Sequence, residues 1–239
     1  MTLFEHLKEL RQRLFRAVAV LIVAMVAVSF AVDYVVVWLV KPLGGGHVIV
    51  LGPTEAPIIY FKIALILGFV LSLPYTLYQA YGFVAPGLYP RERTTLLVGI
   101  PAVVVFFVLG AVFTMEILVP LSMPILMGFF GDVVEPTYSL EKYLSFVTTL
   151  VLWMGLLFQT PLVIYIIARL GLVTPQQLAK ARRLVIFVAA IFAAVVTPTT
   201  DPVTMLLVTG PFIILYELGI LLSRLAARRR IQHAAEPQE

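Results

Sequence analysis

Six long apolar stretches with very few charged residues constrain this chain more than any other feature. A helix rises about 1.5 Å per residue, so about 20 apolar residues cross a hydrocarbon core of roughly 30 Å. The first four stretches meet this length, the fifth is short, and the sixth is near the minimum. We therefore predict an all-α polytopic membrane protein with six transmembrane helices. The six stretches lie at residues 15–37, 58–84, 94–119, 143–168, 184–198 and 203–223.

The composition excludes several classes of chemistry. Hydrophobic residues make up 61% of the chain and charged residues 13%, whereas soluble domains carry about 25% charged residues. The absence of cysteine excludes disulfides and thiolate sites, and the three histidines are too scattered to form a metal-binding motif. We expect no enzymatic activity, no cofactor, no metal and no nucleic-acid partner.

The distribution of basic residues predicts the orientation in the membrane. Of the 17 Lys and Arg residues, 14 lie in segments that the six spans place on one side. Because positive charge is retained in the cytoplasm, both termini should be cytoplasmic. We expect one membrane domain over residues 1–225 and a basic, polar cytoplasmic tail over 226–239. The long loops 38–57 and 120–142 should then pack as caps on the opposite side.

The N-terminal residues predict a short amphipathic helix before the first span. Thr2 and Glu5 fit a capping box, and leucines recur at helical spacing along one face. Glu5, Glu9 and Arg13 follow one another at i, i+4 intervals on another face. Such a helix should lie on the membrane surface.

Local signals predict where helices begin, end or bend. Thr174 and Gln177 fit a second capping box, and Gly171 suits the end of the fourth span. Proline within a span frees a backbone carbonyl and favours a kink, so several kinked helices could enclose a concave face. Prolines of this kind are Pro74, Pro101, Pro161 and Pro211.

Four polar side chains have a structural and a functional interpretation. Glu92 is either a solvated loop carboxylate or a cation-binding group. Gln159 and Glu217 lie within spans, where polar groups either bond another helix or form a functional site. Asp201 could cap the sixth helix, with Pro202 as its first residue.

An ordered set of motifs, running from about residue 3 to 225, resembles the TatC family, the multi-span core of the twin-arginine protein translocase. Each motif alone has low specificity for this family, whereas the ordered set together with six spans is highly specific. The motifs are His6–Leu14, Pro74–Gln79, Phe83–Glu92, Tyr143–Phe146, Phe158–Pro161, Thr197–Pro202 and Tyr216–Leu218.

The resemblance implies a receptor for signal peptides with paired arginines, working with single-span TatA/TatB-type subunits in a multimeric complex. Transport of folded proteins would be driven by the proton-motive force across a bacterial or archaeal cytoplasmic membrane. Glu9 and Glu92 match carboxylates that receive the arginines. The remaining matches are Arg11, Phe83, Pro86 and Leu88 in the recognition region, Pro42 in the first external loop, and Thr197, Asp201 and Thr204 where partner helices dock.

The chain departs from the family pattern at three positions. Gln159 stands where many members carry an intramembrane glutamate, and an amide cannot ionise. Met205 stands where some members have a polar residue, and Glu116 occupies a position associated with apolar residues.

Two other classes of function remain open at this stage. A secondary transporter of a small solute would use Gln159 and Glu217 as a midplane site. A structural membrane scaffold would need none of these side chains.

Overall fold

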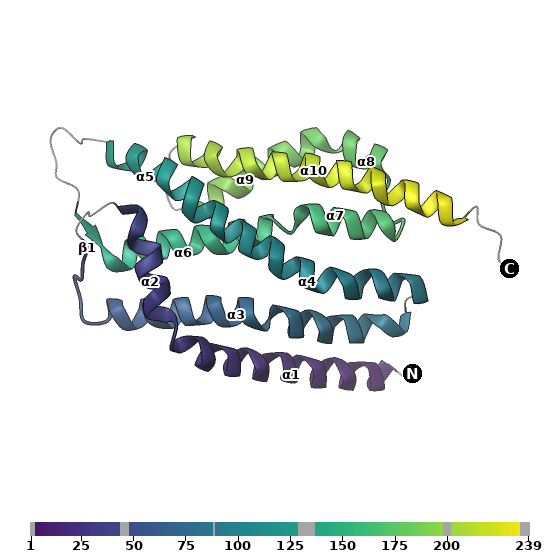
Figure 1. Ribbon diagram of the computed structural model, residues 1–239, viewed down its shortest axis with the longest axis horizontal. Helices are drawn as coiled ribbons and strands as arrows, with labels where there is room; N and C mark the ends of the chain where they lie inside the picture. The colour runs from purple at the N-terminus through teal and green to yellow at the C-terminus, as the bar shows by residue number, and fades with distance from the viewer. Residues whose placement is uncertain (1–2, 44–47, 88, 129–136, 198–201, 235–239) are drawn as a thin grey trace.

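A computed structural model shows an almost entirely helical chain (Figure 1). It describes residues 3–43, 48–87, 89–128, 137–197 and 202–234, with side chains throughout these ranges except at 3, 90–92, 127 and 228–234. The elements in this part of the chain are α1 (Leu3–Ser29), α2 (Val32–Val40), a 3-10 turn η1 (Lys41–Leu43), β1 (Val48–Ile49), α3 (Glu55–Val84), a 3-10 turn η2 (Ala85–Gly87), α4 (Pro90–Phe113), a π-helical turn η3 (Thr114–Leu118), α5 (Val119–Gly128), β2 (Tyr138–Ser139), α6 (Leu140–Leu157), α7 (Thr160–Arg169), α8 (Pro175–Lys180), α9 (Arg182–Val196) and α10 (Pro202–Ala234).

The long helices run along the molecule, and α6 forms much of its core. Figure 1 shows both termini at the same end, together with the α3–α4 and α7–α8 connections, and α2 and β1 at the other end. Helix α3 packs against α1, α4 and α6, while α10 packs along α7 and α9. The side chains of Leu144, Val147, Leu150 and Met154 on α6 are fully buried.

Five helical stretches in the described residues are long and apolar enough to cross a membrane. They are Phe4–Ser29, Glu55–Gly87, Arg93–Leu126, Leu140–Arg169 and Pro202–Ala227. Helix α9 has 15 residues, so it rises only about 22 Å, as expected for the short fifth stretch. The prediction of a short sixth helix is wrong, because α10 extends over 33 residues and continues past position 225.

The predicted surface helix and the predicted boundaries of the first span are also wrong. Helix α1 is continuous from Leu3 to Ser29, because it contains no proline or glycine that would separate a surface segment from a span. The chain turns at Phe30–Ala31, before the predicted end of the span. The hydroxyl of Tyr60 on α3 donates to the Ser29 carbonyl at 2.9 Å and satisfies one orphan acceptor at this helix end. Thr2, the predicted cap, lies outside the described residues.

The third span is longer than predicted. Helix α4 continues through the π-helical turn into α5, so the helical path passes Pro120 and reaches Gly128. Glu116 therefore lies within a continuous helical stretch, with an exposed side chain, rather than near its end.

Two local predictions are confirmed. Thr174 and Gln177 form a reciprocal capping box at the start of α8, and Gly171 has a φ of 77° in the preceding turn. The fourth predicted span breaks at Phe158–Gln159, with Pro161 in the first turn of α7.

The two long loops meet at the end of the molecule away from the termini. Val48 pairs with Tyr138 and Ile49 with Ser139 in a short parallel bridge. Burial raises the pKa of the Tyr138 phenol above its ordinary value. The Ser139 hydroxyl donates to Glu55 Oε2 at 3.3 Å, which ties the second loop to the first turn of α3. The described parts of these loops thus form a packed cap.

Candidate functional site

Glu9 lies where α1 packs against the C-terminal half of α3. Its Oε1 accepts two hydrogen bonds from the Arg13 guanidinium, from Nη2 at 2.6 Å and from Nε at 2.9 Å. Both side chains are 24% exposed, so this ion pair is only partly open to its surroundings. The second oxygen of Glu9, Oε2, is buried and has no hydrogen-bond partner in the described part of the chain.

Helix α3 supplies the other side of this site. Arg13 Nη1 lies 3.5 Å from the Gln79 carbonyl and 3.5 Å from Gln79 Oε1. Gly82, one turn further along α3, faces the same guanidinium, and a Cβ there would lie 2.9 Å from Arg13 Cζ. Next to it, Phe83 stacks on His6 of α1 with ring centroids 4.3 Å apart. We call Glu9, Gln79 and Gly82, which surround the Arg13 guanidinium, the guanidinium seat.

The other predicted recognition residues are close in sequence to the residues of the seat or lie at the same end of the molecule. Arg11 is exposed on α1, and Pro86 is exposed in η2, three residues after Phe83. Glu92 is in the first turn of α4, so its backbone is at the same end of the molecule as Glu9 (Figure 1). The Glu92 side chain and the whole of Leu88 lie outside the described part of the structure.

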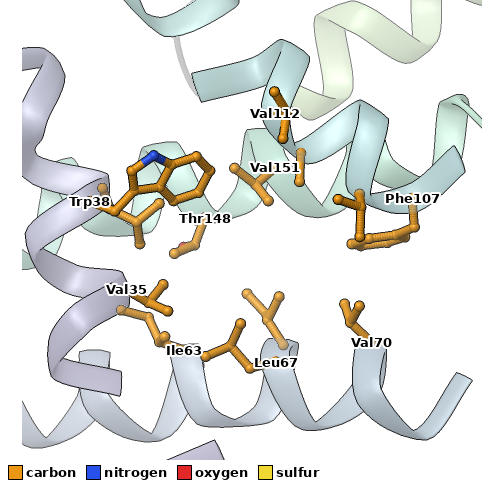
Figure 2. A pocket seen from close by; sticks show the side chains of 13 residues that line it. Val35, Trp38, Ile63, Leu67, Val70, Phe107, Val112, Thr148 and Val151 are labelled. Carbon is orange, nitrogen blue, oxygen red and sulfur yellow. The ribbon is translucent and has the colours of Figure 1, made fainter. Parts of the chain in front are cut away.

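An apolar cavity of about 220 Å³ opens among α2, α3, α4 and α6, further along α3 from the seat. Figure 2 shows Val35 and Trp38 of α2 on one side, with Ile63, Leu67 and Val70 of α3 facing α4 and α6. Thr148 of α6 contributes a hydroxyl, but this hydroxyl already donates a hydrogen bond to the Leu144 carbonyl at 2.6 Å. The wall thus offers mainly hydrophobic contact.

Gln159 stabilises the break between α6 and α7. Its backbone N–H bonds the Leu156 carbonyl, so the Gly155 carbonyl loses its usual helical donor. The side-chain Nε2 replaces that donor at 3.2 Å and also donates to Val103 O of α4 at 3.0 Å. This geometry supports the structural interpretation of Gln159, as a hydrogen bond between helices.

We predict that Gln159→Leu lowers the stability of the folded protein by about 1–2 kcal/mol, because the Gly155 carbonyl loses its donor and the hydrogen bond to the Val103 carbonyl of α4 is lost. Thermal unfolding of the detergent-purified protein measures the change. Gln176→Leu, at an exposed position of α8, is the matched control and should be nearly neutral. Equal effects of the two substitutions would contradict the role of Gln159.

Glu217 does not share a site with Gln159. It forms an ion pair with Arg182 at the start of α9, with Arg182 Nε 2.7 Å from Glu217 Oε1, and both side chains are over 40% exposed. Arg182 Nη2 also donates to Glu217 Oε2 at 2.7 Å. Gln159 thus hydrogen-bonds α4, whereas Glu217 pairs with α9, so Gln159 and Glu217 form no common polar site. The interpretation as a transporter with a midplane site loses its basis.

The predicted partner-docking residues lie at the other ends of α9 and α10. Thr197 is buried, and its hydroxyl donates to Ala193 O at 2.8 Å at the end of α9. Thr204 is fully buried in the first turn of α10, and Met205 packs against the main core. Asp201 lies outside the described residues. Pro42 is in η1, which contacts α5 at this end of the molecule.

Sequence reasoning did not single out two polar contacts in the spans. Lys62 of α3 donates to Ser145 O and Thr149 Oγ1 of α6 at 3.4 and 3.5 Å, which gives this intramembrane cation polar partners. Gln79 and Gly82 were also missed as site residues, since their role depends on the approach of α1.

The fold and the site define a polytopic helical membrane protein with a cluster of polar and charged side chains at the end that holds both termini. Residues 5–211 match the model of the family described as Sec-independent protein translocase protein (TatC). The chain therefore belongs to the TatC family.

Proteins similar to this chain cover nearly its full length. It is 36% identical over 226 residues to the Sec-independent protein translocase protein TatC of Carboxydothermus hydrogenoformans, covering 94% of this chain and 93% of that protein. The TatC of Aquifex aeolicus is 34% identical over 236 residues, covering 96% and 98%. A crystal structure described as twin arginine translocase receptor TatC superposes with a TM-score of 0.79 at 33% identity, covering 92% of this chain and 99% of that one. A second one, in the detergent DDM, gives a TM-score of 0.81 at the same identity, covering 91% and 99%. Family membership makes this chain a protein-transport component rather than an enzyme.

Proposed function

We propose that this chain is the receptor subunit of a twin-arginine translocase, and that Glu9 and Glu92 bind the paired arginines of signal peptides. The observation that carries this proposal is that Glu9 already holds a guanidinium, that of Arg13, against α3. A carboxylate that already binds one guanidinium beside further acceptors on α3 is chemically suited to bind another arginine. The backbone position of Glu92 at the same end of the molecule supports a second carboxylate in the same region.

Two carboxylates would give selectivity for arginine over lysine. Guanidinium groups bond carboxylates with a planar fork of donors, which an ammonium group lacks. Exposed ion pairs contribute only about 0.2–1 kcal/mol each, whereas micromolar binding needs about 8 kcal/mol. Most of the affinity must therefore come from apolar contact.

The cavity beside α3 is suited to a large side chain from the apolar stretch of the peptide. From Gln79 to Leu67, α3 rises about 18 Å, which an apolar helical segment of about 12 residues spans. A peptide whose arginines lie near the seat would thus reach the cavity lined by α2, α3, α4 and α6. Arg11, Phe83, Pro86 and Leu88 would complete the recognition region.

The topology we propose has six spans, with α9 as the short fifth one and both termini in the cytoplasm of a bacterium or archaeon. The 14 basic residues of the predicted cytoplasmic segments support this orientation. Single-span TatA/TatB-type subunits would dock near Thr197, Asp201, Thr204 and Met205, and the proton-motive force would drive transport.

We predict that Glu92→Gln weakens binding of a twin-arginine peptide about fivefold, because one ionic partner is lost while side-chain size is kept. Photo-crosslinking of a peptide with two arginines before an apolar run measures binding, and its two-lysine counterpart measures selectivity. Glu141→Gln, at the start of α6, is the matched control and should leave both unchanged. Undiminished crosslinking to the Glu92 variant would reject the role of Glu92.

A further inference from the structure

We propose that Arg13 is a resident occupant of the guanidinium seat, and that a signal-peptide arginine must replace it on Glu9. This inference rests on the proposed function of Glu9 as a receptor for arginine. It adds a competing side chain within the receptor itself. When no peptide is bound, Arg13 blocks access to Glu9.

The contacts of Glu9 leave neither carboxylate oxygen open to a ligand. Arg13 uses both Nε and Nη2 on the same oxygen, Oε1, at 2.9 and 2.6 Å. The other oxygen, Oε2, is buried and has no hydrogen-bond partner among the described residues. An incoming guanidinium therefore cannot reach Glu9 in this arrangement unless Arg13 moves.

The seat fits a guanidinium rather than being a chance surface pair. Besides Glu9, it presents two acceptors of Gln79, the backbone carbonyl and Oε1, each 3.5 Å from Arg13 Nη1. Gly82 leaves the space that the flat group needs, since a Cβ at that position would overlap Nη1. The seat thus has acceptors on two helices and a glycine between them, which suits a planar cation with several donors.

The position of Arg13 makes it an effective competitor. It lies four residues after Glu9 on α1, where residues of one helix face are neighbours, so its guanidinium is always nearby. A ligand's apparent dissociation constant rises in inverse proportion to the fraction of receptor whose site is open. If Arg13 fills the seat nine times in ten, removing it should tighten ligand binding about tenfold.

We predict that Arg13→Gln tightens binding of the two-arginine peptide about 3- to 10-fold, measured by fluorescence anisotropy on the full chain in nanodiscs. Arg13→Lys keeps the positive charge but lacks the planar fork, so it should also tighten binding, though less. Arg16→Gln is the matched control, since Arg16 is exposed three residues further along α1 and the charge change is the same. It should change affinity less than twofold. Weaker or unchanged binding by both Arg13 variants would overturn the inference.

Glu9→Gln separates this inference from the proposed function. If Glu9 binds the peptide, Glu9→Gln should weaken binding, and it should abolish the gain given by Arg13→Gln in the double variant. No effect of Glu9→Gln alone would reject Glu9 as part of the receptor. A loss with Glu9→Gln, without any gain from Arg13→Gln, would keep the receptor and reject Arg13 as its occupant.

Discussion

Replacing Gly110 by alanine should destabilise the folded protein by about 1–3 kcal/mol, although alanine is the better helix former by about 1 kcal/mol. Gly110 lies on α4 where it crosses α6. A Cβ at this position would meet the Met154 carbonyl at 2.8 Å and the Gly155 Cα at 2.9 Å. Both are backbone atoms, so no side-chain rotation relieves the overlap and the two helices must move apart. Close contact through small residues is a main source of helix association in membranes.

Gly99→Ala provides the control for this prediction on the same helix. A Cβ at Gly99 would meet only Ile166 Cδ1, at an ordinary contact distance of 3.4 Å. This variant should be neutral or slightly more stable, because it gains helix propensity without a collision. Thermal unfolding in one detergent compares both variants with the parent chain. Equal stability of the two variants would show that α4 and α6 do not pack as closely as described.

The sequence predicted the helices and several of their ends because these depend on local signals. Length and apolarity define a span, and the pair Thr174 and Gln177 defines a helix start. The turn at Phe30–Ala31 has no such signal, and the Ser29 carbonyl before it accepts from Tyr60, which is 31 residues away. The π-helical turn at Thr114–Leu118 was likewise not predicted, and the Thr114 hydroxyl there bonds the Gly110 carbonyl.

Only the part of the site that lies on α1 could be predicted from the sequence. The i, i+4 spacing of Glu9 and Arg13 was visible in the sequence and is realised as an ion pair. Nothing local to residues 79–82 predicts that Gln79 and Gly82 face Arg13, because that contact depends on how α1 and α3 pack. The same holds for Glu217, whose partner Arg182 is 35 residues away on another helix.

Filling the apolar cavity with Ala111→Phe should weaken binding of the twin-arginine peptide by about 10- to 100-fold. Ala111 lies on α4 and lines the cavity of about 220 Å³ among α2, α3, α4 and α6. A phenyl ring there would take the space that we assign to a large side chain of the peptide's apolar stretch. Losing the burial of one large apolar side chain costs about 1.5–3 kcal/mol, and each 1.4 kcal/mol is about a tenfold change in affinity.

The selectivity for arginine over lysine should survive Ala111→Phe, because it depends on carboxylates rather than on the apolar wall. Binding of the two-arginine and two-lysine peptides should therefore fall by the same factor. Val105→Phe is the matched control, since Val105 is 56% exposed on α4 and does not line the cavity. Because this variant adds a ring to the same helix outside the cavity, it should bind like the parent chain. If Ala111→Phe bound the peptide with unchanged affinity while remaining folded, the apolar stretch would have to bind elsewhere. The seat at Glu9 would then act without the cavity.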